Sequence, residues 1–462
     1  MPRDVEAQGL HLICTLFKDR PDLLLRLQDI LPPTILLQLS DDFNTTSLVK
    51  VTKTNTVVWC AAFGLLDAGP VVPSTAADEK IIQMLISVLW IPERFQAVLN
   101  VQGGDARRTL DIMQNLLTDN TWWTRFSGRS RSAYGRDLGL PHRRRVRDLL
   151  LQLVRASGFV PSMFYIEEPQ NTLKVTNASR PMALGQGGSC AVYKAIWNGR
   201  MPVAIKHFHH VTSVESAGQN DRAAAFEVTM MLQLHHPYIM RVLGLNTTSF
   251  KAGLQALRSP AIVMEVVEGG NMAVYITQHS NTYPIEKWLL QIAEALTYLH
   301  SEDIAHGDLK PDNIMIDSTS SIKLCDFGSA VFRPTGLGSI GDRYPRAGTV
   351  LFMAPEAVER MGMERSNAPA DTYWPAPACD IYSFAMICIA LYTRSWPAIQ
   401  GLSPNADEGV INRAILEGRR PPRPANMTDA LWTLVQQCWA NDSRARPSAR
   451  QVVASLKAIY GL

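Results

Sequence analysis

The sequence predicts an α+β protein in which an all-α region precedes a region that opens with strands and continues with helices. Three observations lead to this class. The chain has 462 residues, which is too many for one ordinary core and suggests two or three domains. In residues 4–160, apolar side chains recur at helical spacing, as at Leu10, Ile13, Leu16 and Phe17. From about residue 181 onward, short alternating patterns typical of strands appear first.

The helical region is broken by prolines and glycines into about six or seven segments of modest length. A bundle and a short helical solenoid both fit, and we slightly favour the bundle because the region shows no clear repeat period. We assign residues 1–120 to a helical interaction or regulatory domain and residues 121–180 to a basic connector and helix. The basic stretch Trp122 to Arg147 could bind phosphate or act as a nuclear-targeting signal, but a solvated connector is favoured because charged runs are common on surfaces.

Composition limits the class of protein. Hydrophobic residues make up 46% of the chain, enough for a sizeable core, and the net charge of +3 makes a nucleic-acid partner unlikely. The seven cysteines are odd in number and show no CxxC spacing, so we expect reduced thiols and no zinc. The start of the chain does not look like a signal peptide, and the longest apolar run, 381–392, is too short to cross a bilayer. We therefore expect a cytoplasmic protein without a transmembrane segment, with the nucleus as the alternative.

One stretch groups the residue types that phosphoryl transfer requires. It runs from His306 to Asn313 and is followed by Asp326-Phe327-Gly328. Asp308 would accept or orient the proton of a substrate hydroxyl, and Lys310 would steady the transferred phosphate. Asn313 and Asp326 offer the hard oxygen ligands that magnesium prefers.

This order and spacing resemble the catalytic and metal-binding loops of eukaryotic protein kinases. Other motifs of that family follow in order over residues 182–460. They are the glycine-rich stretch Leu184 to Lys194, Val203-Ala204-Ile205-Lys206, Glu227 before His236-Pro237, Gly348-Thr349, Ala354-Pro355-Glu356, Asp380 to Phe384, Cys438-Trp439 and Arg446-Pro447.

The resemblance implies a bilobal kinase domain over residues 181–462. The small lobe, about 181–268, would hold a five-stranded antiparallel sheet and one main helix, and the large lobe, about 269–462, would be mostly helical. The implied catalytic residues are Asp308, Lys310 and Asn313, and the implied metal ligands are Asn313 and Asp326. The implied ATP-binding residues are Leu184, Gly185, Gly187, Val192, Ala204, Lys206, Glu227, Met264, Glu265, Val267 and Met315.

Within this set, the resemblance assigns a role to each group. Lys206 would hold the α and β phosphates, and Glu227 would hold the ammonium group of Lys206. Met264 would be the gatekeeper, with the backbone of Glu265 and Val267 facing adenine. His306 is expected to pack and donate hydrogen bonds rather than act as a base, because Asp308 already has that position.

Three departures from the family bear on mechanism. Cys190 stands at the third glycine of the glycine-rich stretch, a position that tolerates small residues. Gly307 replaces the arginine that many relatives use to pair with a phosphorylated activation segment, so phosphorylation there becomes less necessary. The segment between Glu356 and Asp380 is longer than in the family. Of the properties that the resemblance implies, the mode of substrate docking is therefore the one least safely carried over to this chain.

The predicted function is transfer of the γ-phosphoryl group of ATP to serine or threonine hydroxyls of proteins in intracellular signalling, with Mg2+, or Mn2+ as the alternative ion. The Lys310-Pro311 pair is of the serine/threonine type, and Ser383-Phe384 with Cys438-Trp439 resembles the tyrosine-kinase-like group. The expected partners are a protein substrate and a protein bound by the N-terminal helices. The main alternative is a pseudokinase scaffold, and a kinase of small molecules is a weaker one.

Overall fold

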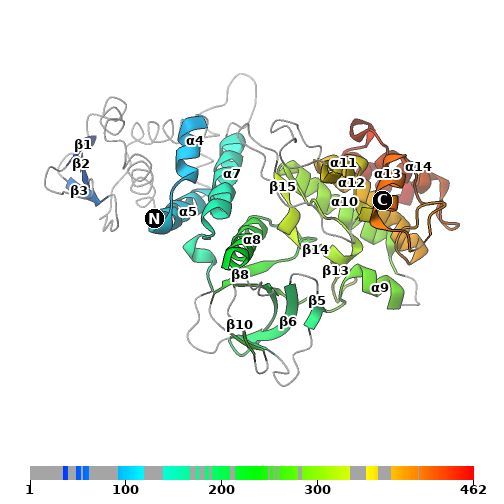
Figure 1. Cartoon of the computed structure of the whole chain (residues 1–462), viewed down its shortest axis with the longest axis horizontal. Helices are drawn as coiled ribbons and strands as arrows, with labels where there is room; N and C mark the ends of the chain where they lie inside the picture. The colour runs from blue at the N-terminus through cyan, green and yellow to red at the C-terminus, as the bar shows by residue number, and fades with distance from the viewer. Residues whose placement is uncertain are drawn as a thin grey trace. The chain divides into compact units, whose positions relative to one another are not determined.

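Figure 1 shows the computed structural model of the chain. It describes residues 35–39, 48–53, 56–61, 92–118, 139–166, 173–175, 183–186, 190–208, 214–247, 250–252, 255–257, 260–278, 283–332, 350–362, 376–403 and 405–462. The chain divides into two compact units. The first combines Met1–Tyr165 with Gly218–Thr229, and the second combines Ile166–Ala217 with Met230–Leu462.

The first unit contains a small antiparallel sheet where helix was expected. Its strands β1 (Ile35–Leu39), β2 (Leu48–Lys53) and β3 (Thr56–Ala61) pair in the order β1-β2-β3. The prediction of helix throughout residues 4–160 is wrong for this stretch. In β2, Val49 and Val51 alternate with polar residues, and branching at Cβ restricts χ1 in a way that favours strands. Strands β1 and β3 are short, mostly apolar runs, which periodicity alone does not distinguish from helix.

Three helices carry the core of the first unit. They are α4 (Pro92–Leu99), α5 (Gly103–Thr118) and α7 (Gly139–Ser157), followed by the short 3-10 helix η1 (Ser162–Phe164). Both α4 and α5 pack against α7. The buried apolar side chains of these helices include Phe95, Val98, Leu110, Met113, Leu117, Leu150, Leu153 and Val154.

Two arginines at the end of the basic stretch are buried. Arg145 is 2% exposed and Arg147 is 6% exposed. The Arg145 guanidinium lies 4.9 Å from the centre of the Phe95 ring, and its burial lowers its pKa. Arg143 donates a hydrogen bond to the Leu117 carbonyl at 3.2 Å. The interpretation as a solvated connector is therefore wrong for Arg145 and Arg147, whereas Arg143 is exposed. Residues 122–138 of the stretch lie outside the described residues.

The second unit opens with a curved antiparallel sheet. Its strands are β4 (Leu173–Val175), β5 (Ala183–Gln186), β6 (Cys190–Trp197), β7 (Met201–Phe208), β8 (Val242–Asn246) and β11 (Ala261–Glu265). The order is β4-β6-β7-β11-β8, and β5 also pairs with β6. The expected five-stranded sheet thus has six strands, because β4 and β5 pair with opposite ends of β6. A separate hairpin is formed by β9 (Phe250–Ala252) and β10 (Gln255–Leu257).

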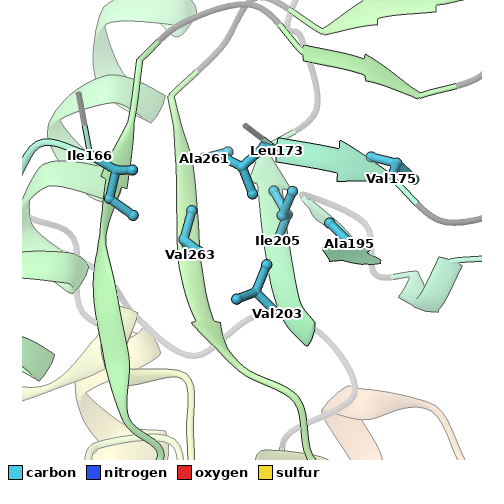
Figure 2. Packing of buried hydrophobic residues seen from close by; sticks show 8 residues of the cluster. All are labelled: Ile166, Leu173, Val175, Ala195, Val203, Ile205, Ala261 and Val263. Atoms are coloured by element: carbon cyan, nitrogen blue, oxygen red, sulfur yellow. The ribbon is translucent and has the colours of Figure 1, made fainter. Parts of the chain in front are cut away.

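One face of this sheet forms a hydrophobic core. Figure 2 shows its eight buried side chains together: Ile166, Leu173, Val175, Ala195, Val203, Ile205, Ala261 and Val263. Because side chains alternate along a strand, Val203 and Ile205 face this core while Ala204 and Lys206 point to the opposite face. On β11, Met264 pairs directly with Ala204 and therefore shares that opposite face. The sheet thus separates its own core from the residues expected to bind nucleotide.

Helix α8 (Val214–Leu232) follows β7. Its middle, Gly218–Thr229, belongs to the first unit, and its two ends belong to the second.

The rest of the second unit is mostly helical (Figure 1). Its helices are α9 (Met272–Gln278), α10 (Ile285–Ser301), α11 (Pro355–Gly362), α12 (Ala376–Thr393), α13 (Glu408–Leu416), α14 (Asp429–Cys438) and α15 (Ala449–Tyr460). Short strands lie between them: β12 (Ile304–Ala305), β13 (Ile314–Ile316), β14 (Ile322–Leu324) and β15 (Val331–Phe332). The 3-10 turns are η2 (Pro311–Asn313), η3 (Phe327–Ser329), η4 (Val350–Phe352) and η5 (Ser443–Ala445).

Helix α12 forms the centre of this helical part. Its residues 379–391 are buried, and it packs against α10 and α14. A helix that is apolar all round belongs in a core, which explains why this apolar run is protected on every side. Across the described part of the chain, none of the helices combines the length and the apolar character needed to cross a membrane.

Candidate active site

The loop after β12 is held by the buried carboxylate of Asp380, near the start of α12. Oδ2 of Asp380 accepts hydrogen bonds from the His306 backbone N–H at 2.9 Å and from His300 Nε2 at 2.9 Å. Oδ1 accepts one from the Gly307 N–H at 3.0 Å. A buried carboxylate is tolerated only when its oxygens are satisfied in this way. The backbone leading into Asp308 is consequently fixed to the central helix.

His306 joins this loop to the Asp326 segment. The side chain is fully buried, and its Nδ1 accepts a hydrogen bond from the Asp308 N–H at 3.3 Å. Its Nε2 therefore carries the proton and donates to the Cys325 carbonyl at 3.0 Å. The imidazole ring also lies 4.8 Å from the ring of Phe327. Both ring nitrogens are engaged, which agrees with the packing role expected for this histidine.

Asp308, Lys310 and Asn313 come together in one hydrogen-bonded group. Lys310 Nζ lies 2.7 Å from Oδ2 of Asp308. Asn313 Nδ2 donates to the Asp308 carbonyl at 2.8 Å and to the same Oδ2 at 3.1 Å. The other carboxylate oxygen, Oδ1, is buried and has no hydrogen-bond partner among the described residues. One oxygen of Asp308 is thus held in place, and the other is left as an acceptor.

Burial changes the acid strength of Asp308. It raises the pKa of the carboxyl group, and the ammonium group of Lys310 opposes this by lowering it. A raised pKa makes a carboxylate a better proton acceptor near neutral pH. The site therefore combines an unpaired acceptor oxygen with a carboxylate of increased basicity.

Lys206 and Asp326 form an ion pair. β7 places Lys206 on the face opposite the sheet core, and its Nζ lies 3.0 Å from Oδ1 of Asp326. This contact lowers the pKa of Asp326 to about 2, so the carboxylate is ionised at neutral pH. Asp326 itself has a φ of +63°, which only a few per cent of non-glycine residues adopt. This pair was not expected from the sequence, because the resemblance assigns the Lys206 ammonium group to Glu227.

Glu227 is buried on α8, at 3% exposure. It lies in the stretch of α8 that groups with the first unit, whereas Lys206 lies in the second. The ion pair between Glu227 and Lys206 therefore stays a prediction.

The residues expected around adenine lie on neighbouring segments. Ala204 and Met264 are direct partners across β7 and β11, and Val192 pairs with Lys206 across β6 and β7. Both Ala204 and Met264 are buried, and Val267 is 9% exposed. The backbone N–H of Glu265 donates to the Arg241 carbonyl at 3.0 Å, so an adenine contact by Glu265 would use its carbonyl group.

The segment after β11 is tied to β13, the strand of Met315. The Gly269 N–H donates to the Ile316 carbonyl at 2.9 Å, and the Ile316 N–H donates to the Gly270 carbonyl at 2.9 Å. A Cβ at Gly269 would lie 2.5 Å from the Ile316 carbonyl oxygen, so only glycine permits this approach. Met315 is thereby brought to the segment that carries Val267.

The glycine-rich stretch is described only in part. Leu184 and Gly185 lie in β5, where Gly185 pairs with Val192. The side-chain position of Leu184 lies outside the described residues, as do Gly187, the tip of the turn and the expected motif Gly348-Thr349.

A buried ion pair links α11 to the segment before α15. The Arg446 guanidinium, whose side chain is fully buried, binds both oxygens of Glu356 at 2.7 and 2.8 Å. The Cys379 thiol donates a hydrogen bond to the same Glu356 at 3.2 Å. Such bidentate pairing fixes both position and orientation. Two motifs that the resemblance singled out, Ala354-Pro355-Glu356 and Arg446-Pro447, therefore meet in the folded chain.

A family model described as a protein kinase domain matches residues 179–456. The chain belongs to this family. Protein kinases as a family are transferases that use ATP and a divalent metal ion.

Several relatives of this chain are named as protein kinases. It is 29% identical over 298 residues to a light-sensor protein kinase of Ceratodon purpureus, which covers 60% of this chain and 21% of that protein. It is 32% identical over 282 residues to a probable serine/threonine-protein kinase of Arabidopsis thaliana, and the match covers 59% of this chain and 24% of that protein. A serine/threonine/tyrosine-protein kinase of the same plant is 25% identical over 276 residues, and the match covers 59% of this chain and 63% of that protein. The chain thus spans less than a quarter of the length of the first two.

The kinase site contains a donor set that suits a hard divalent cation. Asn313 and Asp326 offer side-chain oxygens from adjoining segments, since the Cys325 N–H donates to the Asn313 carbonyl at 2.9 Å. Magnesium is commonly held by one or two carboxylates together with substrate phosphates and water. Within the described residues there is no cluster of three or more His, Cys, Asp or Glu side chains that could hold a metal ion by themselves. The residues present therefore fit a metal that arrives with a nucleotide.

Proposed function

We propose that this kinase transfers the γ-phosphoryl group of ATP to serine or threonine hydroxyls of a protein substrate, with Mg2+ bound by Asn313 and Asp326. The observation that carries this proposal is the buried Oδ1 of Asp308, which has no partner among the described residues while Oδ2 is held by Lys310 and Asn313. Leaving a buried acceptor unpaired costs about 1–3 kcal/mol, and acceptance of a substrate proton would explain this cost at Asp308.

Each of the residues at the site has a separate role in the reaction. Oδ1 of Asp308 accepts the proton of the substrate hydroxyl as the hydroxyl oxygen bonds to the γ-phosphorus. The bond between that phosphorus and the β–γ bridging oxygen breaks, and ADP leaves with the electron pair. Lys310 offsets charge on the transferred group, and Lys206 orients the α and β phosphates. Asn313 and Asp326 would hold the magnesium ion, which would supply neutralisation of the developing charge.

The choice of serine and threonine rests on Lys310-Pro311 and on the relatives' names. A relative in Arabidopsis thaliana is named a probable serine/threonine-protein kinase, whereas another is named for tyrosine as well. We also propose membership of the tyrosine-kinase-like group, on Ser383-Phe384 and Cys438-Trp439, and a signalling role with a protein partner for the N-terminal helices. The alternative specificity is phosphoryl transfer to tyrosine hydroxyls.

The test is phosphate incorporation by purified full-length protein with Mg2+, labelled ATP and a generic basic protein as acceptor. Asp308→Asn and Lys206→Met should abolish incorporation, and hydrolysis of the product should show phosphoserine or phosphothreonine. Asp429→Asn is the matched control, since that carboxylate is 94% exposed on α14 and should leave the rate unchanged.

The outcomes separate the alternatives. Wild-type rates in Asp308→Asn would overturn the catalytic assignment, and label found only on tyrosine would overturn the specificity. A wild-type protein that binds ATP yet transfers nothing would favour a pseudokinase scaffold.

A further inference from the structure

The end of α7 lies against α8 within the first unit. Gly158 terminates α7: its N–H donates to the Val154 carbonyl at 2.8 Å, and its φ of +77° is in the left-handed region. A Cβ at this position would lie 3.1 Å from Cγ of Arg222 on α8. Glycine therefore serves two purposes here, because it ends the helix and leaves room for the neighbouring one.

A second contact lies one turn further along α8. The guanidinium group of Arg155 is 4.3 Å from the centre of the Phe226 ring, and Phe226 is only 2% exposed. Residues four apart share a helix face, so Arg222 and Phe226 lie on the same side of α8. That face of α8 thus receives both residues, Arg155 and Gly158, from the end of α7.

The segment after α7 is held to α5, so the end of α7 cannot move freely. The Arg107 guanidinium lies 4.7 Å from the ring of Phe159 and 5.7 Å from that of Tyr165. The Ser162 hydroxyl donates to Asp111 at 2.8 Å. These contacts make α5, the end of α7 and the middle of α8 one packed assembly.

We propose that Arg155 is a positioning residue for phosphoryl transfer, acting through Phe226 on its neighbour Glu227. Adjacent residues of a helix move together, so a rotation of α8 that displaces the Phe226 ring also turns the Glu227 carboxylate. Glu227 is the group expected to hold the Lys206 ammonium on the ATP phosphates, and in kinases this pair must be in place for catalysis. This inference rests on the proposed function and on the predicted pairing of Glu227 with Lys206.

The chemistry of the contact sets the size of the effect. A guanidinium stacked on a buried aromatic ring loses its attraction when either partner is removed, and such contacts change an equilibrium by roughly 2- to 30-fold. Lysine at position 155 would keep the charge but lose the planar stacking, so it should restore only part of the effect. Leucine at position 226 would keep apolar volume without the ring.

The experiment measures KM for ATP and kcat in full-length Arg155→Ala, Arg155→Lys, Phe226→Leu and the Arg155→Ala/Phe226→Leu double variant. We expect KM for ATP to rise roughly 2- to 30-fold in Arg155→Ala and less in Arg155→Lys, with little change in KM for the protein acceptor. The double variant should be no worse than the poorer single variant, because both remove the same contact. Arg200→Ala, in the exposed turn before β7, is the control.

Two further measurements keep this inference separate from the proposed function. Thermal unfolding shows which variants are folded, and calorimetric binding of a non-hydrolysable ATP analogue with Mg2+ reports nucleotide affinity when no transfer occurs. Failure of transfer in the wild type would count against the proposed function alone. A folded Arg155→Ala protein with wild-type nucleotide affinity, or additive losses in the double variant, would overturn the role of Arg155.

Discussion

Gly307 packs directly against the backbone carbonyl of Ser329, the residue after the Asp326-Phe327-Gly328 motif. A Cβ at position 307 would lie under 3.0 Å from that oxygen, and the φ of Gly307 is +79°. Both observations exclude larger side chains in this conformation. Gly307 was expected to matter through the absence of an arginine. The structure adds that this loop and the Ser329 segment approach so closely that glycine is needed.

We expect Gly307→Ala to destabilise the protein by more than the roughly 1–3 kcal/mol that a strained backbone alone costs. The matched control is Gly199→Ala, where φ is +68° but nothing lies within 4 Å of the added Cβ. Urea unfolding of both variants gives the comparison. Equal losses of unfolding free energy at the two positions would show that the Ser329 contact does not matter.

Asp308→Asn should remove turnover without lowering thermal stability at neutral pH. The folded-state pKa of Asp308 is raised by burial, so its ionisation makes the folded state less stable as the pH rises above the unfolded value. Asparagine avoids that cost and can still accept a hydrogen bond from Lys310. We expect an unchanged or higher melting temperature by scanning calorimetry, together with a loss of activity of about 10²- to 10⁴-fold or more. A clearly lower melting temperature would contradict this account of Asp308.

The Lys206–Asp326 pair should give a pH-dependent contribution to stability. The pKa of Asp326 is lowered to about 2, so its contribution is fully present above the unfolded value of 3.8 and is lost as the pH falls toward 2. The Asp326 side chain is 43% exposed, so solvent screening keeps the contribution small. Denaturant unfolding of wild type and Lys206→Met at pH 5 and pH 3 should show a difference that shrinks at the lower pH. A difference that is the same at both pH values would argue against the pair.

Arg446→Ala should cost roughly 3–5 kcal/mol of unfolding free energy, because it leaves the carboxylate of Glu356 without its buried partner. Arg423→Ala offers a comparison, since Arg423 pairs with the exposed Asp429 at 2.6 Å and exposed pairs contribute only about 0–1 kcal/mol. Chemical unfolding followed by circular dichroism would measure both. Similar small losses in the two variants would mean that burial adds nothing to the Glu356 pair.

The stretch 35–61 shows how local signals compete. Helical spacing before and after it favoured helix, yet the stretch forms three paired strands, of which only β2 shows an alternation of valine with polar residues. A strand is stabilised by pairing with another strand, and the spacing of apolar residues within one segment carries no information about that partner. The same limit applies to Arg145. Its position in a basic run predicted an exposed side chain, but packing against Phe95 buries it.

The candidates for the chemistry can be predicted from the sequence alone. Residue type and order select Lys206, Asp308 and Asn313, and the alternation of a strand separates Lys206 from the core residues Val203 and Ile205. The contacts of Lys206 with Asp326 and of Gly307 with Ser329 become apparent only in the folded chain. Each of these contacts joins residues that are distant along the chain, and local spacing carries no information about which distant groups the folded backbone will bring within contact.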